Sequence, residues 1–267
     1  MTFNNYKISV IIPTYNRENT ILAAIESVLK QTYPVFEILI CDDGSLDHTK
    51  NKVLSLNNDK IKWIDGIHSG KPAVPRNRGI LNSTGDLIAF LDSDDTWEFN
   101  KIENQIFHFS SNNCKASFTN GMKFHNKTLT KFHNNYINKE INTFNLLKDN
   151  YIICSSTLIE KKLIKEIGYF NESDSLKAIE DYSYWLRVSY FTNWIYLDKN
   201  LLIYNDDIEN SIRKIDKRSY FQQKRTILVD FSNWILIQKN KKYFLLLYIY
   251  YLIFKLDFYN KSRTIFK

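Results

Sequence analysis

The stretch Leu87-Ile88-Ala89-Phe90-Leu91 followed by Asp92-Ser93-Asp94 joins an apolar run to an acidic D-x-D end. A run that is apolar throughout predicts a strand buried on both faces of a sheet. Carboxylates at the C-terminal tip of such a strand face the crevice where α/β folds bind ligands. Two carboxylates one residue apart can share one hard cation, and such cations favour oxygen ligands and substrate phosphates. The stretch therefore predicts that a nucleotide diphosphate is handled through a metal.

Read alone, the acidic segment also suits a polar turn and helix N-cap, because Asp, Ser and Thr are favoured in both. Its surroundings favour the ligand site. Residues 7–12 form a second apolar run stopped by Pro13, residues 21–29 carry apolar side chains at helical spacing, and residues 36–41 form a third run. Strand, helix and strand in this order make a βαβ unit, which implies a parallel sheet.

Further motifs in a fixed order extend this pattern. They occupy residues 9–17, 28–34, 38–45, 70–80, 84–95, 168–172 and 180–186. With these motifs the chain resembles the family 2 glycosyltransferases of the GT-A fold, and the resemblance covers residues 7–205. It implies an α/β fold with a Rossmann-like, mostly parallel central sheet and flanking helices. It also implies an enzyme that uses a nucleotide sugar.

We expect three regions along the chain. Residues 1–97 are expected to be the nucleotide-sugar-binding half of the GT-A domain, residues 98–205 its acceptor-binding half, and residues 206–267 a C-terminal helical extension. The finer pattern predicts helices over 101–109, 163–167 (ended by Gly168) and 220–238. It also predicts strands over 116–119 and 155–159, and a loop or hairpin around 125–145 that lies over the site.

The composition is that of a globular protein, with 44% hydrophobic residues and only 7 Gly and 4 Pro among 267 residues. Cys41, Cys114 and Cys154 lie far apart and form no C-x-x-C motif, so we expect buried free thiols in a reducing compartment. The histidines show no zinc spacing, and residues 1–7 show no signal peptide.

The positive charge is concentrated at the C-terminal end. Residues 199–267 hold 14 Lys and Arg against 6 Asp and Glu, whereas residues 1–198 hold 22 against 23. In this region, residues 243–254 form an apolar run rich in Tyr, Phe and Leu and bracketed by lysines. The run is shorter than the roughly 20 residues that a spanning helix needs. It suits either a membrane interface or a buried helix or dimer contact, and the positive surroundings favour lipid at the cytoplasmic face of the inner membrane.

Tyr15 and Asp43 are the candidates for holding the nucleotide, because each follows a predicted strand. Tyr15 can stack on a base, although ordinary packing is the alternative, and Asp43 can accept from a base N–H or from the ribose. The resemblance implies that Asp43 contacts uracil and that Pro13, Thr14 and Tyr15 form the pocket wall. Asp42 is a further candidate beside them.

For the diphosphate, the interpretation is that Asp94 binds Mn²⁺ or Mg²⁺ directly, while Asp92, next to Ser93, holds the ribose or a metal-bound water. Arg76 is a candidate partner for phosphate oxygens, since a guanidinium pairs well with them. It follows Pro75 where relatives carry a small residue. Many relatives also carry a His in the region that matches residues 202–207, and this chain has none there, so Arg213 or Lys214 is expected to supply a cation.

Glu180-Asp181 opens a predicted helix, where the helix dipole stabilises a carboxylate and burial raises its pKa. By resemblance, Asp181 is the base of one in-line displacement that inverts the anomeric centre; the alternative is an acidic N-cap. Glu180, Trp185 and Arg213 are candidate acceptor-side or accessory residues.

The sequence thus predicts an inverting, metal-dependent transferase that moves a hexose or N-acetylhexosamine from a UDP-sugar to a hydroxyl of a cell-surface glycan. The acceptor is expected in lipopolysaccharide, capsule or a lipid-linked oligosaccharide. The alternative is a non-catalytic nucleotide-sugar or glycan-binding protein of the same fold. A nucleotidyltransferase is disfavoured because residues 13–16 form no Gly-rich basic loop, and no nucleic-acid-binding motif accompanies the basic residues.

Overall fold

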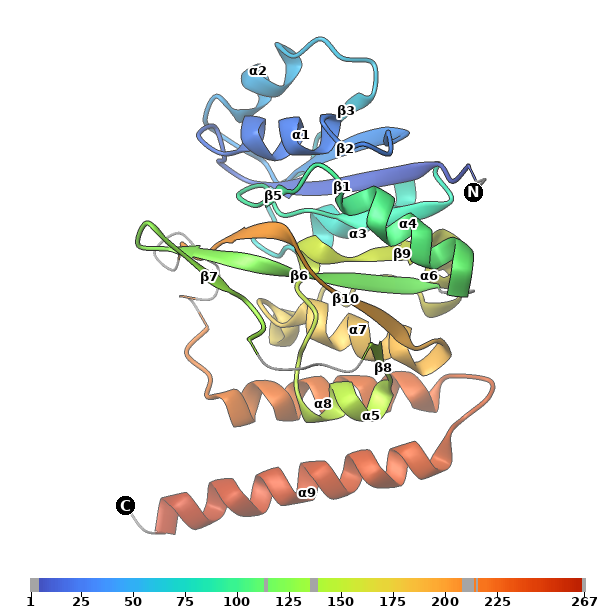
Figure 1. Cartoon of the computed structure of the whole chain (residues 1–267). Coiled ribbons are helices and arrows are strands. Elements are labelled where there is room, and N and C mark those ends of the chain that lie inside the picture. The colour runs from blue at the N-terminus through green and yellow to red at the C-terminus, as the bar shows by residue number, and fades with distance from the viewer. Residues whose placement is uncertain (1–4, 113–114, 135–138, 208–213, 215, 266–267) are drawn as a thin grey trace.

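The computed structural model describes residues 5–112, 115–134, 139–207, 214 and 216–265. Within these residues, ten strands form one sheet with helices on both faces, and two further helices follow at the C-terminal end (Figure 1). The main path of the sheet runs β3-β2-β1-β4-β9-β6-β10-β5, with β7 paired to β6 and β8 paired to β10.

The first part of the sheet is parallel, as the βαβ pattern predicts. It contains β1 (Ile8–Thr14), α1 (Ile21–Leu29), β2 (Glu37–Asp42), α2 (Thr49–Leu54), β3 (Ile61–Ile64), α3 (Ala73–Asn82) and β4 (Leu87–Phe90). Strands β1, β2 and β4 are buried along their whole length, which explains their continuous apolar runs. Because these strands are parallel, their carboxyl ends meet at one edge of the sheet, and the polar residues that follow them meet there too.

The second part makes the sheet a mixed one. It comprises β5 (Thr96–Trp97), α4 (Lys101–Asn112), β6 (Ala116–His125), β7 (Thr128–Lys131), β8 (Glu140–Ile141), α5 (Thr143–Lys148), β9 (Leu158–Glu160), α6 (Lys161–Ile167), α7 (Glu180–Phe191) and β10 (Trp194–Asn205). Strand β9 runs antiparallel to both β4 and β6, whereas β6 and β10 are parallel.

The strand predicted over 155–159 is shorter and later than expected. A 3₁₀ turn at Cys154–Ser156 precedes β9, because hydroxyl groups there bond to nearby carbonyl groups: Ser156 Oγ to Ile153 O at 2.7 Å and Thr157 Oγ1 to Cys154 O at 2.9 Å. The predicted hairpin around residue 125 is present as β6 and β7. The helix that ends at Gly168 is also present, with Gly168 at φ +88°.

Alternate residues of β1 belong to two different hydrophobic clusters, which places one core on each face of the sheet. Ile11 joins the cluster that includes α3, α6 and α7, while Val10 and Ile12 join the cluster that includes α1 and α4. The expectation of buried free thiols is confirmed for Cys41 and Cys154, and Cys114 lies outside the described residues.

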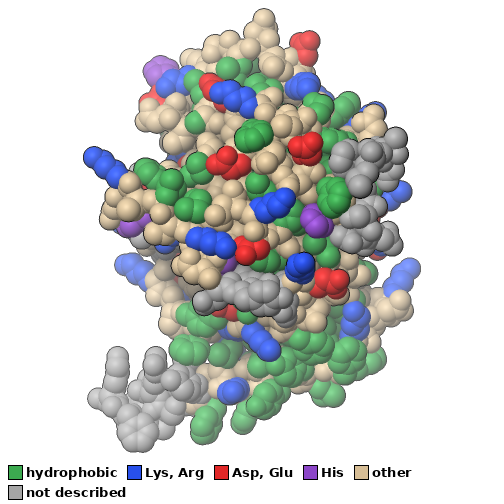
Figure 2. Space-filling view, in the orientation of Figure 1, with side chains coloured by type: hydrophobic (Ala, Val, Ile, Leu, Met, Phe, Trp, Pro, Cys, Tyr) green, Lys and Arg blue, Asp and Glu red, His purple; other side chains and the backbone are tan. Residues whose placement is uncertain are grey.

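Helices α8 (Tyr220–Leu236) and α9 (Tyr243–Ile265) form the C-terminal extension, and α9 packs along α8 (Figure 1). Leu245, Leu246 and Ile249 are buried on the inner face of α9. The outer face exposes a row of large side chains, and Figure 2 shows hydrophobic side chains gathered over this helix: Tyr243, Phe244, Leu247, Tyr250, Tyr251, Phe254 and Phe258. No helix in the described part of the chain combines the length and apolar character needed to cross a bilayer.

Candidate active site

A cavity of about 890 Å³ lies at the carboxyl ends of β1, β2 and β4. Ten of the candidate residues line it together: Pro13, Thr14, Tyr15, Asp43, Arg76, Asp92, Ser93, Asp94, Glu180 and Asp181. Trp185 does not line it. Its side chain is fully buried between Phe170, at 5.8 Å between ring centroids, and Trp194, at 5.3 Å, so it packs the core rather than contacting an acceptor. Arg213 lies outside the described residues, and Lys214 lines the cavity.

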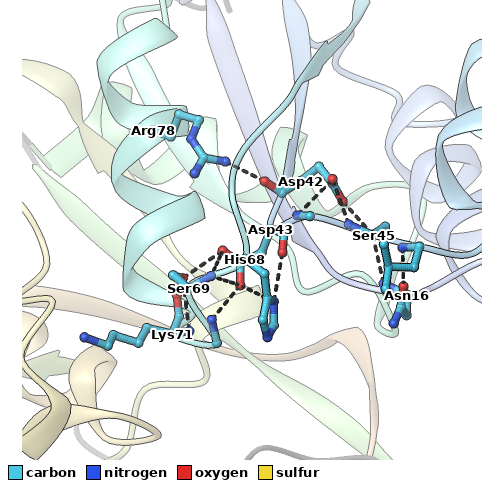
Figure 3. A network of polar contacts seen from close by, with 11 residues as sticks. Asn16, Asp42, Asp43, Ser45, His68, Ser69, Lys71 and Arg78 are labelled. Carbon is cyan, nitrogen blue, oxygen red and sulfur yellow. Dashed lines mark hydrogen bonds and ion pairs between the residues drawn. The ribbon is translucent and has the colours of Figure 1, made fainter.

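Asp43 is fixed by the loop before α3 (Figure 3). Its carboxylate accepts hydrogen bonds from the backbone N–H of Ser69 at 3.0 Å, the backbone N–H of Gly70 at 2.9 Å and the Ser69 hydroxyl at 2.7 Å. Gly70 has φ +65°, a conformation that suits glycine. His68 Nδ1 also lies 3.2 Å from Asp43 Oδ2, so a further donor such as a base N–H would share the carboxylate with these groups.

Two aromatic rings stand beside Asp43. The His68 ring stacks on Tyr15 with 4.1 Å between centroids and an interplanar angle of 26°, and His68 Nδ1 lies 2.9 Å from the Asp43 carbonyl oxygen. Because the two rings cover each other's inner faces, a nucleobase could stack only on an outer face of the pair. No sequence motif marks His68 as a site residue, because its place in the site depends on a contact with Tyr15, which lies 53 positions earlier in the chain.

Asp42 has a different role from Asp43. Its carboxylate accepts from the backbone N–H groups of Gly44 at 3.0 Å and Ser45 at 2.9 Å, and from the Ser45 hydroxyl at 2.5 Å (Figure 3). It is not among the residues that line the cavity. Asp42 therefore closes the turn after β2 and positions Asp43 for the cavity.

Acidic groups crowd the end of β4. Burial raises the pKa of Asp94, the neighbouring charge of Asp92 raises it further, and Arg17, which lies 3.6 Å from Asp94, opposes both effects. Behind them, buried Asp95 accepts from the Ser155 hydroxyl at 2.5 Å and from the Asn205 N–H at 2.8 Å, and Ser155 Oγ accepts from the Asp92 N–H at 3.0 Å. This network holds the D-x-D backbone in place.

The donor set at this position fits a hard divalent cation only in part. Asp92 and Asp94 supply carboxylate oxygens beside the cavity, yet within the described ranges no group of three or more His, Cys, Asp and Glu side chains is arranged to hold a metal. Mg²⁺ and similar ions are commonly held by one or two carboxylates with substrate phosphates and water completing the shell. The arrangement therefore fits an ion that is bound together with a diphosphate.

Arg76 connects the two sides of the cavity. Its side chain is buried, and it donates from Nη2 to Asp92 Oδ1 at 2.8 Å and from Nη1 to Glu180 Oε1 at 2.6 Å. Arg76 lies on α3, Asp92 follows β4, and Glu180 begins α7. Since both terminal nitrogens are engaged by carboxylates, the geometry makes Arg76 a positioning residue for them. The phosphate contact expected from the sequence stays a prediction.

Asp181 lies in the first turn of α7 beside this ion pair, and its residue is half-buried. Burial raises the pKa of Asp181 from 3.8 to about 7, with the charge of Glu180 adding to the effect and Arg76 opposing it. A carboxylate with this pKa is present in both protonation states near neutral pH. Asp181 can therefore accept a proton and still be substantially ionised beforehand.

Comparison with known proteins places this geometry in context. The family model described as Glycosyl transferase family 2 matches residues 9–168. A UDP-Glc:alpha-D-GlcNAc-diphosphoundecaprenol beta-1,3-glucosyltransferase of Escherichia coli is 36% identical over 186 residues, which are 69% of this chain and 70% of that protein. A second Escherichia coli protein with this activity in its name is 31% identical over 226 residues, which are 85% of this chain and 84% of that protein.

Among solved structures, TarS 1-349 of S. aureus in complex with UDP-GlcNAc resembles this chain with a TM-score of 0.72. The sequence identity is 22%, and the match covers 88% of this chain and 68% of that one. This likeness confirms the α/β fold of the GT-A type, with its mixed sheet, flanking helices and C-terminal helices.

Proposed function

The chain belongs to glycosyl transferase family 2, and from this premise we propose that it moves a hexose or N-acetylhexosamine from a UDP-sugar to a hydroxyl of a lipid-linked or other cell-surface glycan. The observation that carries the proposal is the pairing of Asp181, with its raised pKa, and the D-x-D carboxylates on one cavity. The relatives are named for transfer from UDP-Glc to a diphosphoundecaprenol-linked sugar, and TarS was solved with UDP and UDP-GlcNAc.

In this proposal each wall of the cavity has one task. One outer face of the stacked Tyr15–His68 pair packs against the uracil while Asp43 accepts from its N–H, and Arg76 holds Asp92 next to the ribose. Asp181 removes the proton from the acceptor hydroxyl as the oxygen attacks the anomeric carbon from the face opposite the departing UDP. One displacement of this kind inverts the anomeric centre.

Mn²⁺ or Mg²⁺ would be held by Asp94, with Asp92 beside it, and would neutralise charge on the diphosphate of the departing nucleotide. Asp95 and Ser155 keep these carboxylates in place through the hydrogen bonds at the end of β4.

The test is a transfer assay with a panel of UDP-sugars, preceded by a hydrolysis screen that needs no acceptor. Asp181→Asn keeps the shape of the side chain but removes the base, so transfer should fall about 10²-fold or more, while UDP affinity measured by calorimetry should be retained. Asp59→Asn, at an exposed position in the segment between α2 and β3, is the matched control and should transfer normally. Full transfer by Asp181→Asn would show that another residue is the base. A wild type that binds UDP-sugar but neither hydrolyses nor transfers it would favour a binding protein.

The proposal includes a peripheral contact between the outer face of α9 and a membrane. This face is exposed and aromatic, with Phe244 61%, Leu247 71% and Phe254 69% accessible, and Lys241, Lys242 and Lys255 flank it. Aromatic rings prefer the depth of lipid headgroups, and lysines favour anionic lipid.

The inner face of α9 packs on α8, so removal of the helix would expose core residues. A better test replaces Phe244, Leu247 and Phe254 together with Gln. In a flotation assay the wild type should associate with anionic vesicles, more strongly at low salt, and the triple variant should not. Equal flotation of both proteins, or no flotation of the wild type, would exclude this contact.

A further inference from the structure

The loop between β3 and α3, residues 65–72, closes directly on the end of β2. Two of its backbone N–H groups donate to the Asp43 carboxylate at distances of 2.9 to 3.1 Å. The turn after β2 packs against the same loop, since a Cβ atom at Gly44 would lie only 2.8 Å from the backbone nitrogen of His68. The position of this loop therefore decides where the Asp43 carboxylate points.

Arg78 contacts the end of β2 from outside the cavity. It lies half-buried on α3 and is not among the residues that line the cavity. Its Nη1 donates to the carbonyl oxygen of Asp42 at 2.5 Å, and Figure 3 shows the side chain pointing from α3 to this residue. Burial raises the pKa of Cys41 to about 12, and the nearby Arg78 charge opposes this. Arg78 thus holds the strand at the residue before Asp43.

The same guanidinium lies against the loop at Gly66. A Cβ atom at Gly66 would lie 1.8 Å from Arg78 Nη1, 2.1 Å from Cζ and 2.2 Å from Nη2. The guanidinium therefore fills the space that any larger residue at this position would need. Arg78 is in contact with both parts of the closed arrangement, with the end of β2 through a hydrogen bond and with the loop through close packing.

The other end of the loop is tied by Lys71. Its ammonium pairs with Asp174 at 2.7 Å and donates to the Glu172 carbonyl at 3.1 Å, but the Asp174 side chain is 87% exposed. Exposed ion pairs contribute little, because water and salt screen them. A hydrogen bond from a charged donor at a half-buried position contributes more. We therefore expect Arg78 to constrain the loop more strongly than Lys71 does.

We propose that Arg78 is a positioning residue for recognition of the nucleobase: it fixes the loop against the end of β2 and so holds the Asp43 carboxylate where it accepts the N–H of uracil. The inference rests on the proposed function and adds a residue outside the cavity that makes the site selective for uridine nucleotides. Uracil carries a hydrogen on its ring nitrogen N3, whereas cytosine has a lone pair there. A fixed carboxylate favours the first and repels the second.

The test compares the binding of UDP and CDP by calorimetry, with Mn²⁺ present throughout. The wild type should prefer UDP. Arg78→Ala should weaken UDP binding about tenfold, the usual loss for one hydrogen bond of a charged donor, and should leave CDP binding nearly unchanged. In a transfer assay, KM for the UDP-sugar should rise while kcat stays the same. Arg225→Ala removes an exposed arginine that pairs with Asp257 on the C-terminal helices, and this control should bind both nucleotides like the wild type.

Gly66→Ala gives an independent test of the same contact. The three atoms nearest to the new methyl group all belong to the end of the Arg78 side chain, which can move without unfolding the protein. The substitution should push the guanidinium away from Asp42 and reproduce the selective loss of UDP affinity. In the Arg78→Ala background the methyl group has room, so adding Gly66→Ala should cause little further loss.

Three results would overturn the assignment. An equal loss of UDP and CDP affinity in Arg78→Ala would indicate general damage to the fold rather than a misplaced Asp43. Additive losses in the double variant would mean that Gly66 and Arg78 do not act through one contact. A wild type without preference for UDP over CDP would show that the base is not read. Because binding needs no turnover, a failure of the transferase proposal appears separately, as selective UDP binding without any transfer.

Discussion

Replacing Asp181 by Asn should make the protein more stable as well as inactive. The pKa of Asp181 is raised from 3.8 to about 7, chiefly by burial and next by Glu180. An acid whose pKa is higher in the folded state binds more protons folded than unfolded, so its ionisation costs stability as the pH rises. The cost is absent below about pH 4, grows through pH 7, and is constant above it. Asn carries no charge and avoids this cost at every pH.

The size of the effect follows from the shift in pKa. At about 1.4 kcal/mol for each pH unit, a rise from 3.8 to about 7 corresponds to an upper limit of about 4 kcal/mol above pH 8. Asp181 is only half-buried, so water in the cavity solvates part of the charge. We therefore expect a gain of about 1 to 2 kcal/mol at pH 8.5. At pH 4 the gain should be close to zero.

Urea unfolding of the wild type and of Asp181→Asn at pH 4.5, 7 and 8.5 measures the difference. Asp59→Asn, at an exposed position, is the control and should show no such trend. A stabilisation that is equal at all three pH values would reflect hydrogen bonding or packing of the Asn side chain rather than lost charge. A variant less stable than the wild type at pH 8.5 would refute the reasoning, because it would mean that the folded protein favours the Asp181 carboxylate.

Two further predictions concern activity. In a transfer assay, kcat/KM should rise with pH through a midpoint at about 7 and level off about one pH unit higher, because Asp181 must be ionised to act. Glu180→Gln should move this midpoint to lower pH, because it removes a charge that raises the Asp181 pKa; an unmoved midpoint would mean that the profile does not report on these two carboxyl groups. EDTA should abolish transfer, and added Mn²⁺ or Mg²⁺ should restore it. The variant Asp94→Ala should stay inactive when metal is added. Full transfer in EDTA would exclude a role for metal at the D-x-D carboxylates.

The sequence was sufficient for those parts of the fold that depend on local pattern. Strands β1, β2 and β4 are buried along their length, so their apolar runs were unambiguous, and parallel pairing then fixed which ends meet. For this reason the residue pattern alone predicts that Tyr15, Asp43 and Asp94 share one cavity, as they do. The helix that begins at Glu180 was equally clear, because acidic residues precede its apolar positions.

Contacts between distant residues were not predictable in the same way. Trp185 lies one helical turn after Asp181, yet it is fully buried, because α7 is covered on nearly every side and spacing alone could not show which face meets the cavity. The outcome for residues 243–254 was also mixed. The helix there is buried along one face, where it packs on α8, and exposed along the other, so a contact of the exposed face with lipid or with a second chain stays a prediction.

Among the contacts in the cavity, those of Arg76 matter most for the proposed mechanism, because they join its two sides. One buried guanidinium pairs with Asp92 on the proposed donor side and with Glu180 next to the base, and its charge also lowers the pKa of Asp181. The value near 7 is thus a balance in which burial and Glu180 act against Arg76. A change to any of these groups must alter both the position of the D-x-D carboxylates and the basicity of Asp181. The donor and acceptor sides are therefore coupled energetically through this residue, and substitutions of Asp92 and Glu180 should be non-additive even though the two residues lie 88 positions apart in the chain.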